Sequence, residues 1–144
     1  MIERKIYIDN YDWEVHIFYH VTCYWTERIM DCLKDIGCPA DKLRKSYKLL
    51  SSCESNTGVT YSNYRLRSTV MVICDTSSSA QFVNSLDHER KHLEAHIAQA
   101  FDIPPYGEEI AYLSGDIGQL LAKDMQMFIC ECDCCKNKVK QLKN

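Results

Sequence analysis

The sequence FVNSLDHERKHLEAHI, residues 82–97, is the stretch that decides how this chain is expected to fold. On a helical wheel of about 100° per residue its large apolar side chains fall on one stripe, which predicts an amphipathic helix. The stripe consists of Phe82, Leu86, Leu93 and Ile97. His88 and His92 lie on the flank of the stripe, and Glu89 lies between them and it. These three side chains are therefore expected at the edge of the buried face.

His88, Glu89 and His92 form the pattern H-E-x-x-H. Two histidines four residues apart lie one helical turn above each other, so both imidazoles can bind one metal ion. A glutamate beside the first histidine can act as a general base toward a water on that ion. The pattern predicts a catalytic zinc site. The alternative is an amphipathic helix whose polar side chains are only solvated.

A catalytic zinc ion needs a third protein ligand in addition to water. His96 lies one turn further along the helix, but it is about 12 Å along the axis from His88, too far to share one ion. A second helix is expected over residues 107–129, and Glu108 faces away from its apolar side, among small residues that would permit close approach. Glu108 is therefore the expected third ligand, and Glu109, about a quarter turn aside on the wheel, is the weaker candidate.

The motif and the segment after it carry a family resemblance. H-E-x-x-H is followed by a break at residues 102–107, then by the run E-E-I-A-Y at residues 108–112, with Gly115 soon after. This arrangement resembles the glutamate-zincin metallopeptidases, and the likeness covers roughly residues 66–120. Short intracellular members and small relatives encoded by phages or mobile elements are closest in size.

The resemblance implies a role for each motif residue. His88, His92 and Glu108 would hold Zn²⁺. Glu89 would be the general base, and Tyr112 would help to stabilise a developing oxyanion.

The sequence departs from the family inside the motif, where the two middle positions are usually uncharged and are here Arg90 and Lys91. Positive charge near the site would lower the metal affinity unless these side chains extend to solvent. Two functions follow. The chain is expected to be a zinc-dependent metallopeptidase that hydrolyses peptide bonds, or a catalytically degenerate, zinc-binding accessory or interaction protein of phage or mobile-element origin.

The bulk properties limit the partners. A length of 144 residues predicts one domain, with its core over 1–129 and a polar tail, rich in Cys and Lys, over 130–144, of which residues 136–144 are expected to fray. A net charge of −3 argues against a nucleic-acid or anionic-membrane surface, so the expected partner is a peptide or protein substrate. No apolar run approaches the roughly 20 residues that span a bilayer, and the N-terminus lacks the apolar core of a signal peptide.

Cysteine is abundant, with nine residues in the chain. The odd number indicates a reduced, cytoplasmic protein rather than a secreted disulfide scaffold. Four of them form a cluster near the C-terminus: Cys130, Cys132, Cys134 and Cys135. They would be soft ligands if gathered around Zn²⁺ or Cu(I). Their spacing is interpreted as lacking the C-x-x-C pairs of a zinc finger, and no second pair stands elsewhere at the right distance. A helix end with buried and exposed thiols is therefore the expected interpretation; a tail site for metal loading or lipid modification stays open.

The remaining segments complete an expected α+β domain of minimal zincin-like type, in which a small, mostly antiparallel sheet packs on helices in the order ββααββαα. The predicted strands are 4–8, 13–20, 59–62 and 66–74, and the predicted helices are 23–36, 40–52, 79–101 and 107–129. The strand ending at Cys74 is expected to border the cleft and to pair with an extended peptide through an open edge.

Overall fold

Residues 82–97 lie within one long helix, α3 (Ser79–Ala100), in the computed structural model, which describes residues 1–142. The Ser78 hydroxyl caps this helix by accepting a hydrogen bond from the Gln81 backbone N–H at 3.2 Å. The four apolar side chains at positions 82, 86, 93 and 97 are all buried. The predicted amphipathic helix is confirmed.

Residues 1–142 contain a four-stranded sheet with the strand order β1-β2-β4-β3. Its strands are β1 (Ile2–Ile8), β2 (Trp13–Val21), β3 (Gly58–Asn63) and β4 (Ser68–Cys74). The β1–β2 and β3–β4 pairings are antiparallel, and β2–β4 is parallel, so the sheet is mixed. Parallel neighbours need a long crossover connection, and here the chain between β2 and β3 supplies two helices, α1 (Thr26–Asp35) and α2 (Ala40–Ser51).

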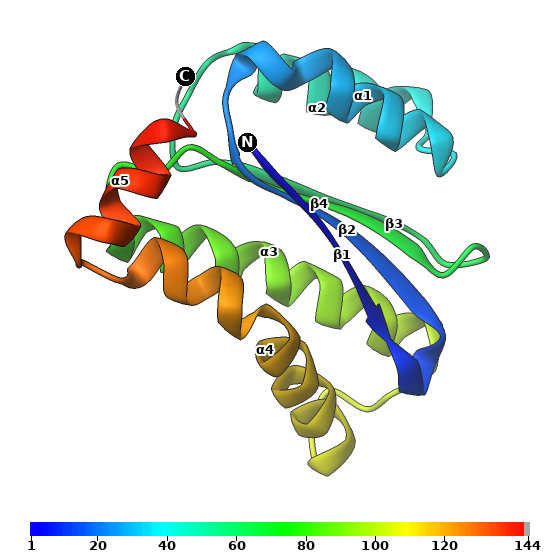
Figure 1. The fold of residues 1–144 in the computed structure, drawn as a ribbon. Helices are drawn as coiled ribbons and strands as arrows, with labels where there is room; N and C mark the ends of the chain where they lie inside the picture. The colour runs from blue at the N-terminus through cyan, green and yellow to red at the C-terminus, as the bar shows by residue number, and fades with distance from the viewer. Residues whose placement is uncertain (143–144) are drawn as a thin grey trace.

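Helices cover both faces of the sheet (Figure 1). α1 and α2 lie on one face, and α3 lies with α4 (Glu108–Ile129) on the other. Alternation along the inner strands fills both interfaces: Trp13, Ile17 and Met71 belong to the core under α3 and α4, whereas Phe18 and Val72 belong to the core under α1 and α2. The inner strands β2 and β4 are therefore buried on both faces.

The open edge of the sheet beside α3 belongs to β3. The strand ending at Cys74 is β4, which pairs with β2 on one side and β3 on the other. The expectation that this strand would offer a free edge is therefore wrong. The reason is that β4 inserts parallel to β2, which leaves β3 outermost.

The C-terminal segment is helical rather than frayed. α5 (Asp133–Gln141) follows α4, and Val139 and Leu142 pack against the core formed by α3 and α4. The α+β class is confirmed, but across residues 1–142 the order is ββααββααα, so the predicted order lacks the last helix. Residues 143–144 of the predicted tail lie outside the described residues.

None of the helices within 1–142 is long and apolar enough to cross a membrane.

A disulfide joins Cys23, just before α1, to Cys53, just after α2. The reduced state expected for all nine cysteines is therefore wrong for this pair. The bond closes a loop with a sequence separation of 30 and ties together the two ends of the α1–α2 layer. Such a cross-link stabilises a fold mainly by restricting the unfolded chain.

We predict that the Cys23→Ser/Cys53→Ser variant loses about 2–4 kcal/mol of unfolding free energy, because the unfolded chain regains the entropy of this loop. Urea denaturation followed by circular dichroism measures the loss. As a control, a thiol reductant should lower the stability of the wild-type protein by a similar amount and leave the double variant unchanged. Equal stability of the wild type and the variant in the absence of reductant would contradict the prediction.

Candidate functional site

The two motif histidines form an exposed pair on α3. The Nε2 atoms of His88 and His92 lie 3.2 Å apart, so one imidazole donates a hydrogen bond to the other. Zinc–nitrogen bonds of about 2.0–2.1 Å at a tetrahedral angle would hold two nitrogens roughly 3.4 Å apart. The pair therefore already has the spacing that one zinc ion requires.

Glu89 faces the other way, into the interface between α3 and the edge strand β3. Its side chain is buried, and its Oε2 accepts a hydrogen bond from the Thr60 hydroxyl at 2.7 Å. Burial raises the pKa of the Glu89 carboxyl, and the Thr60 hydrogen bond and the nearby His88 and His92 act against that rise. The motif glutamate thus anchors the helix to the sheet on the same turn that carries the histidines.

Gly58 makes room for this carboxylate. A Cβ atom at position 58 would lie 2.6 Å from Glu89 Oε1 and 2.7 Å from the Val72 carbonyl oxygen. A side chain would therefore force apart β3 and α3. Sequence reasoning missed Gly58 because nothing local marks it as the neighbour of a residue 31 positions later.

The pairing of α3 with α4 places Glu108 away from the histidines. Ser114 donates a hydrogen bond to Glu94 Oε1 at 2.9 Å, and Gly118 lies beside the Arg90 guanidinium. The two helices therefore run antiparallel, with the first turn of α4 beside the C-terminal part of α3. Because His88 lies near the middle of α3 and Glu108 lies level with its C-terminal end, the two are about three turns apart along the helix axis.

Tyr112 shares this distant position. Both Tyr112 and Glu108 are exposed and line a surface hollow with Tyr11, whose hydroxyl donates to Glu109 Oε1 at 3.5 Å. The physical reason is the apolar face of α4, which turns Leu113, Ile117 and Leu121 inward and leaves the opposite face in solvent. Within residues 1–142 no third His, Cys, Asp or Glu ligand atom gathers with the histidine pair. The predicted set of three ligands does not come together.

The charged residues inside the motif have acidic partners. Arg90 lies 3.5 Å from Asp87 and 3.4 Å from Glu94, and Lys91 lies 3.7 Å from Glu94. Glu94 is buried and also accepts the Ser114 hydrogen bond, so it links α3 to α4. The positive charge that set the motif apart from the zincin pattern is thus compensated along the side of α3 that faces α4.

His96 belongs to a buried chain of hydrogen bonds. The Trp13 indole N–H donates to Thr69 Oγ1 at 2.8 Å, Thr69 and Ser62 hydroxyls lie 2.7 Å apart, and Ser62 Oγ lies 2.8 Å from His96 Nδ1. Both hydroxyl protons of this hydrogen-bond chain find an acceptor when Thr69 donates to Ser62 and Ser62 donates to His96. His96 Nδ1 is then an acceptor, and its proton resides on Nε2.

This chain of hydrogen bonds ties α3 to β3, β4 and β2. Burial lowers the pKa of His96, and the positive charges of His92 and Lys42 lower it further. The structure therefore gives His96 a role in holding the helix on the sheet, in keeping with its rejection as a third ligand.

The C-terminal cysteines form the one group within residues 1–142 that brings together three side chains able to hold a metal ion. The sulfur atoms of Cys130, Cys132 and Cys135 all lie within 4.8 Å of one another. Hydrogen bonds, first from the backbone N–H of Cys135 and then from the Cys130 and Cys135 thiols, lower the pKa of the Cys132 thiol to about 7, and the side-chain bonds to Cys132 and Cys130 raise the pKa of the Cys135 thiol to about 11. The interpretation that the cluster lacks C-x-x-C pairs is wrong, because Cys132 and Cys135 have this spacing, and it is the signal that could have found the group.

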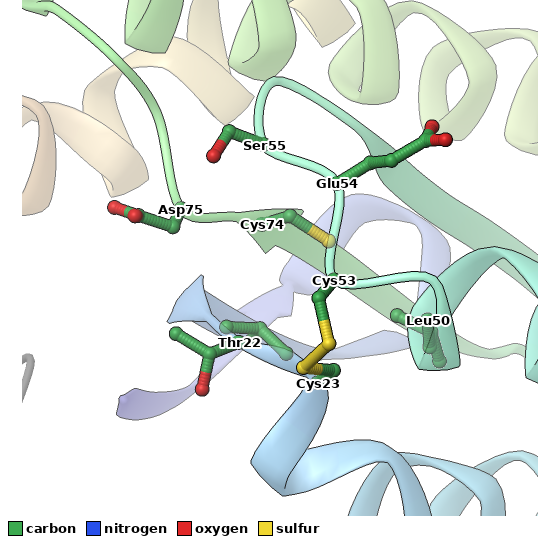
Figure 2. Close-up of a pocket in the computed structure, with 9 residues that line it drawn as sticks. Thr22, Cys23, Leu50, Cys53, Glu54, Ser55, Cys74 and Asp75 are labelled. Atoms are coloured by element: carbon green, nitrogen blue, oxygen red, sulfur yellow. A yellow bond between two sulfur atoms is a disulfide. The ribbon is translucent and has the colours of Figure 1, made fainter.

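A cavity of about 230 Å³ lies beside the Cys23–Cys53 disulfide (Figure 2). Cys74 lines the same cavity; burial raises the pKa of its thiol, which leaves it protonated and unreactive. Neither histidine of the motif lines this cavity, so it is separate from the candidate site.

Comparison with protein-family models, curated proteins and solved structures finds no match to this chain. The likeness to the glutamate zincins therefore rests on the motif residues alone.

We predict that the His96→Asn variant changes how stability depends on pH. The folded protein holds the pKa of His96 below its ordinary value of 6.5, so as pH falls through 6.5 the unfolded chain binds a proton that the folded chain refuses. The contribution of His96 to stability is thus constant above this range and is lost as pH falls below it. Asn can still accept the Ser62 hydrogen bond but does not titrate.

Urea denaturation of both proteins between about pH 8 and pH 5 tests this, because the wild-type protein should lose stability relative to the variant at the acid end. A difference that stays constant over the whole range would contradict the account of His96.

Proposed function

We propose that this chain is a zinc-binding, zincin-like accessory or interaction protein in which His88 and His92 hold one Zn²⁺ at the surface of α3. The observation that carries the proposal is the 3.2 Å separation of the two exposed Nε2 atoms. Imidazole nitrogen is a preferred zinc ligand, and two such ligands leave the remaining positions of a tetrahedral ion to water or to a group from a partner.

Charges around the pair support a cation there. Glu89 lies on the same turn, close enough that each histidine affects its pKa. Arg90 and Lys91 are drawn toward Asp87 and Glu94 by ion pairs. Arg90 and Lys91 should therefore lower the metal affinity less than the sequence alone indicates. The partner that completes the coordination is proposed to be a peptide or protein with a carboxylate or histidine to offer.

The second candidate function is peptide-bond hydrolysis, with Glu89 as the general base. It is favoured by the position of β3, an edge strand beside α3 that could pair with an extended peptide next to the histidines. Zinc would polarise the peptide carbonyl and acidify a water molecule. Glu89 would have to leave its hydrogen bond with Thr60 to accept a proton, and a third ligand would have to come from a movement of α4 or from a partner.

We predict that His88→Ala or His92→Ala weakens zinc binding at least about tenfold, or ~1.4 kcal/mol, because each removes one of two chelating nitrogens. Calorimetric titration measures this in full-length protein whose Cys130, Cys132 and Cys135 are replaced by Ser, so that thiols do not compete for zinc. Glu108→Ala is the matched control and should leave the affinity unchanged. If Glu108→Ala weakened binding as much as His88→Ala, the two-ligand proposal would fail and the original three-ligand set would stand.

We expect no chelator-sensitive cleavage when the zinc-loaded protein is incubated with an unfolded protein substrate, because residues 1–142 place no third ligand beside the histidine pair and Glu89 is engaged with Thr60. Mass spectrometry of the digest is the measurement. Cleavage that disappears in Glu89→Gln while zinc remains bound would establish the second candidate instead.

A further inference from the structure

The segment that links α4 to α5 brings three sulfur atoms together. α4 ends at Ile129, Cys130 follows in extended conformation, and Cys132 occupies the N-cap of α5. The Cys130 and Cys132 sulfurs lie 3.1 Å apart, and Cys135, one turn into α5, completes the group within 4.8 Å.

These sulfurs are accessible and belong to a folded element. Cys132 is exposed, while Cys130 and Cys135 are half-buried. α5 is held in place by packing of Val139 on the core, and its first turn is closed by a backbone hydrogen bond from the Lys136 N–H to the Cys132 carbonyl at 3.0 Å. An ion could thus reach the thiols without opening the protein.

The donor set indicates the kind of ion. Thiolates are soft ligands that select Cu(I), zinc or iron–sulfur clusters. Structural zinc is almost always four-coordinate, and within residues 1–142 no fourth Cys, His, Asp or Glu joins this group. Three thiolates without a fourth ligand suit Cu(I), which is stable in three-coordinate form. The N-terminus of α5 and the adjacent Lys136 offset part of the negative charge that such a complex carries, while the neighbouring Glu131 and Asp133 add to it.

We propose that Cys130, Cys132 and Cys135 form a three-thiolate binding site for Cu(I), separate from the histidine pair on α3. Each thiol that still carries a proton releases it to solvent as its sulfur binds the ion, and no electron is transferred. Cys134 stands in the same helix but outside the group, so it takes no part.

Anaerobic titration of the full-length protein with the Cu(I)–bicinchoninate complex tests this site, with ascorbate to keep the copper reduced and the Cys23–Cys53 disulfide intact. The wild-type protein should remove one copper per chain from the coloured complex. Cys132→Ser and, independently, Cys135→Ser should weaken binding at least about 100-fold. Cys134→Ser is the matched control and should bind as the wild type does.

His88→Ala should also bind copper as the wild type does, so failure of the zinc proposal would leave this one standing. Three results would overturn the proposal: equal copper binding by the wild type and both cysteine variants, an equal loss in Cys134→Ser, or displacement of the copper by equimolar Zn²⁺. A circular dichroism melt of each variant confirms that it is folded.

Discussion

The part-buried hydrogen bond between Glu89 and Thr60 is the constraint on which the candidate site depends. A carboxylate that leaves water needs a partner, and Thr60 supplies one from the edge strand at 2.7 Å. The bond requires Gly58 beside it, since any side chain there would collide with the carboxylate. It also fixes the rotation of α3 about its axis, and with Glu89 pointing at the sheet, His88 and His92 point outward and toward each other.

Apolar periodicity was enough to predict α3 and most other elements, because the spacing of the apolar side chains along each segment shows which face will be buried. Phe82, Leu86 and Leu93 are buried as expected. The position of Glu108 could not be obtained in the same way. A helical wheel shows which faces of α4 are polar or apolar, but it does not show which face meets α3. The apolar face carrying Leu113 and Ile117 does so, which leaves Glu108 in solvent.

Features that depend on contacts between distant residues were out of reach of the sequence. The Cys23–Cys53 bond and the insertion of β4 between β2 and β3 arise only when the layers assemble. The disulfide also weighs against the cytoplasmic location expected from the cysteine count, since such bonds are rare in that compartment. By contrast, the C-x-x-C spacing of Cys132 and Cys135 was visible in the sequence, and the structure gives it meaning by placing Cys130 against it.

In the proposed site, zinc binds to His88 and His92 while Glu89 remains hydrogen-bonded to Thr60. Anomalous diffraction at the zinc edge, from crystals of the full-length protein soaked with Zn²⁺, tests it most directly because it separates the histidine pair from the C-terminal thiols. We expect an anomalous peak at bonding distance from His88 Nε2 and His92 Nε2, with the Glu89–Thr60 hydrogen bond kept and Glu108 in solvent. A zinc ion that Glu108 also ligates, or the absence of an anomalous peak at the two histidines, would contradict the two-histidine site.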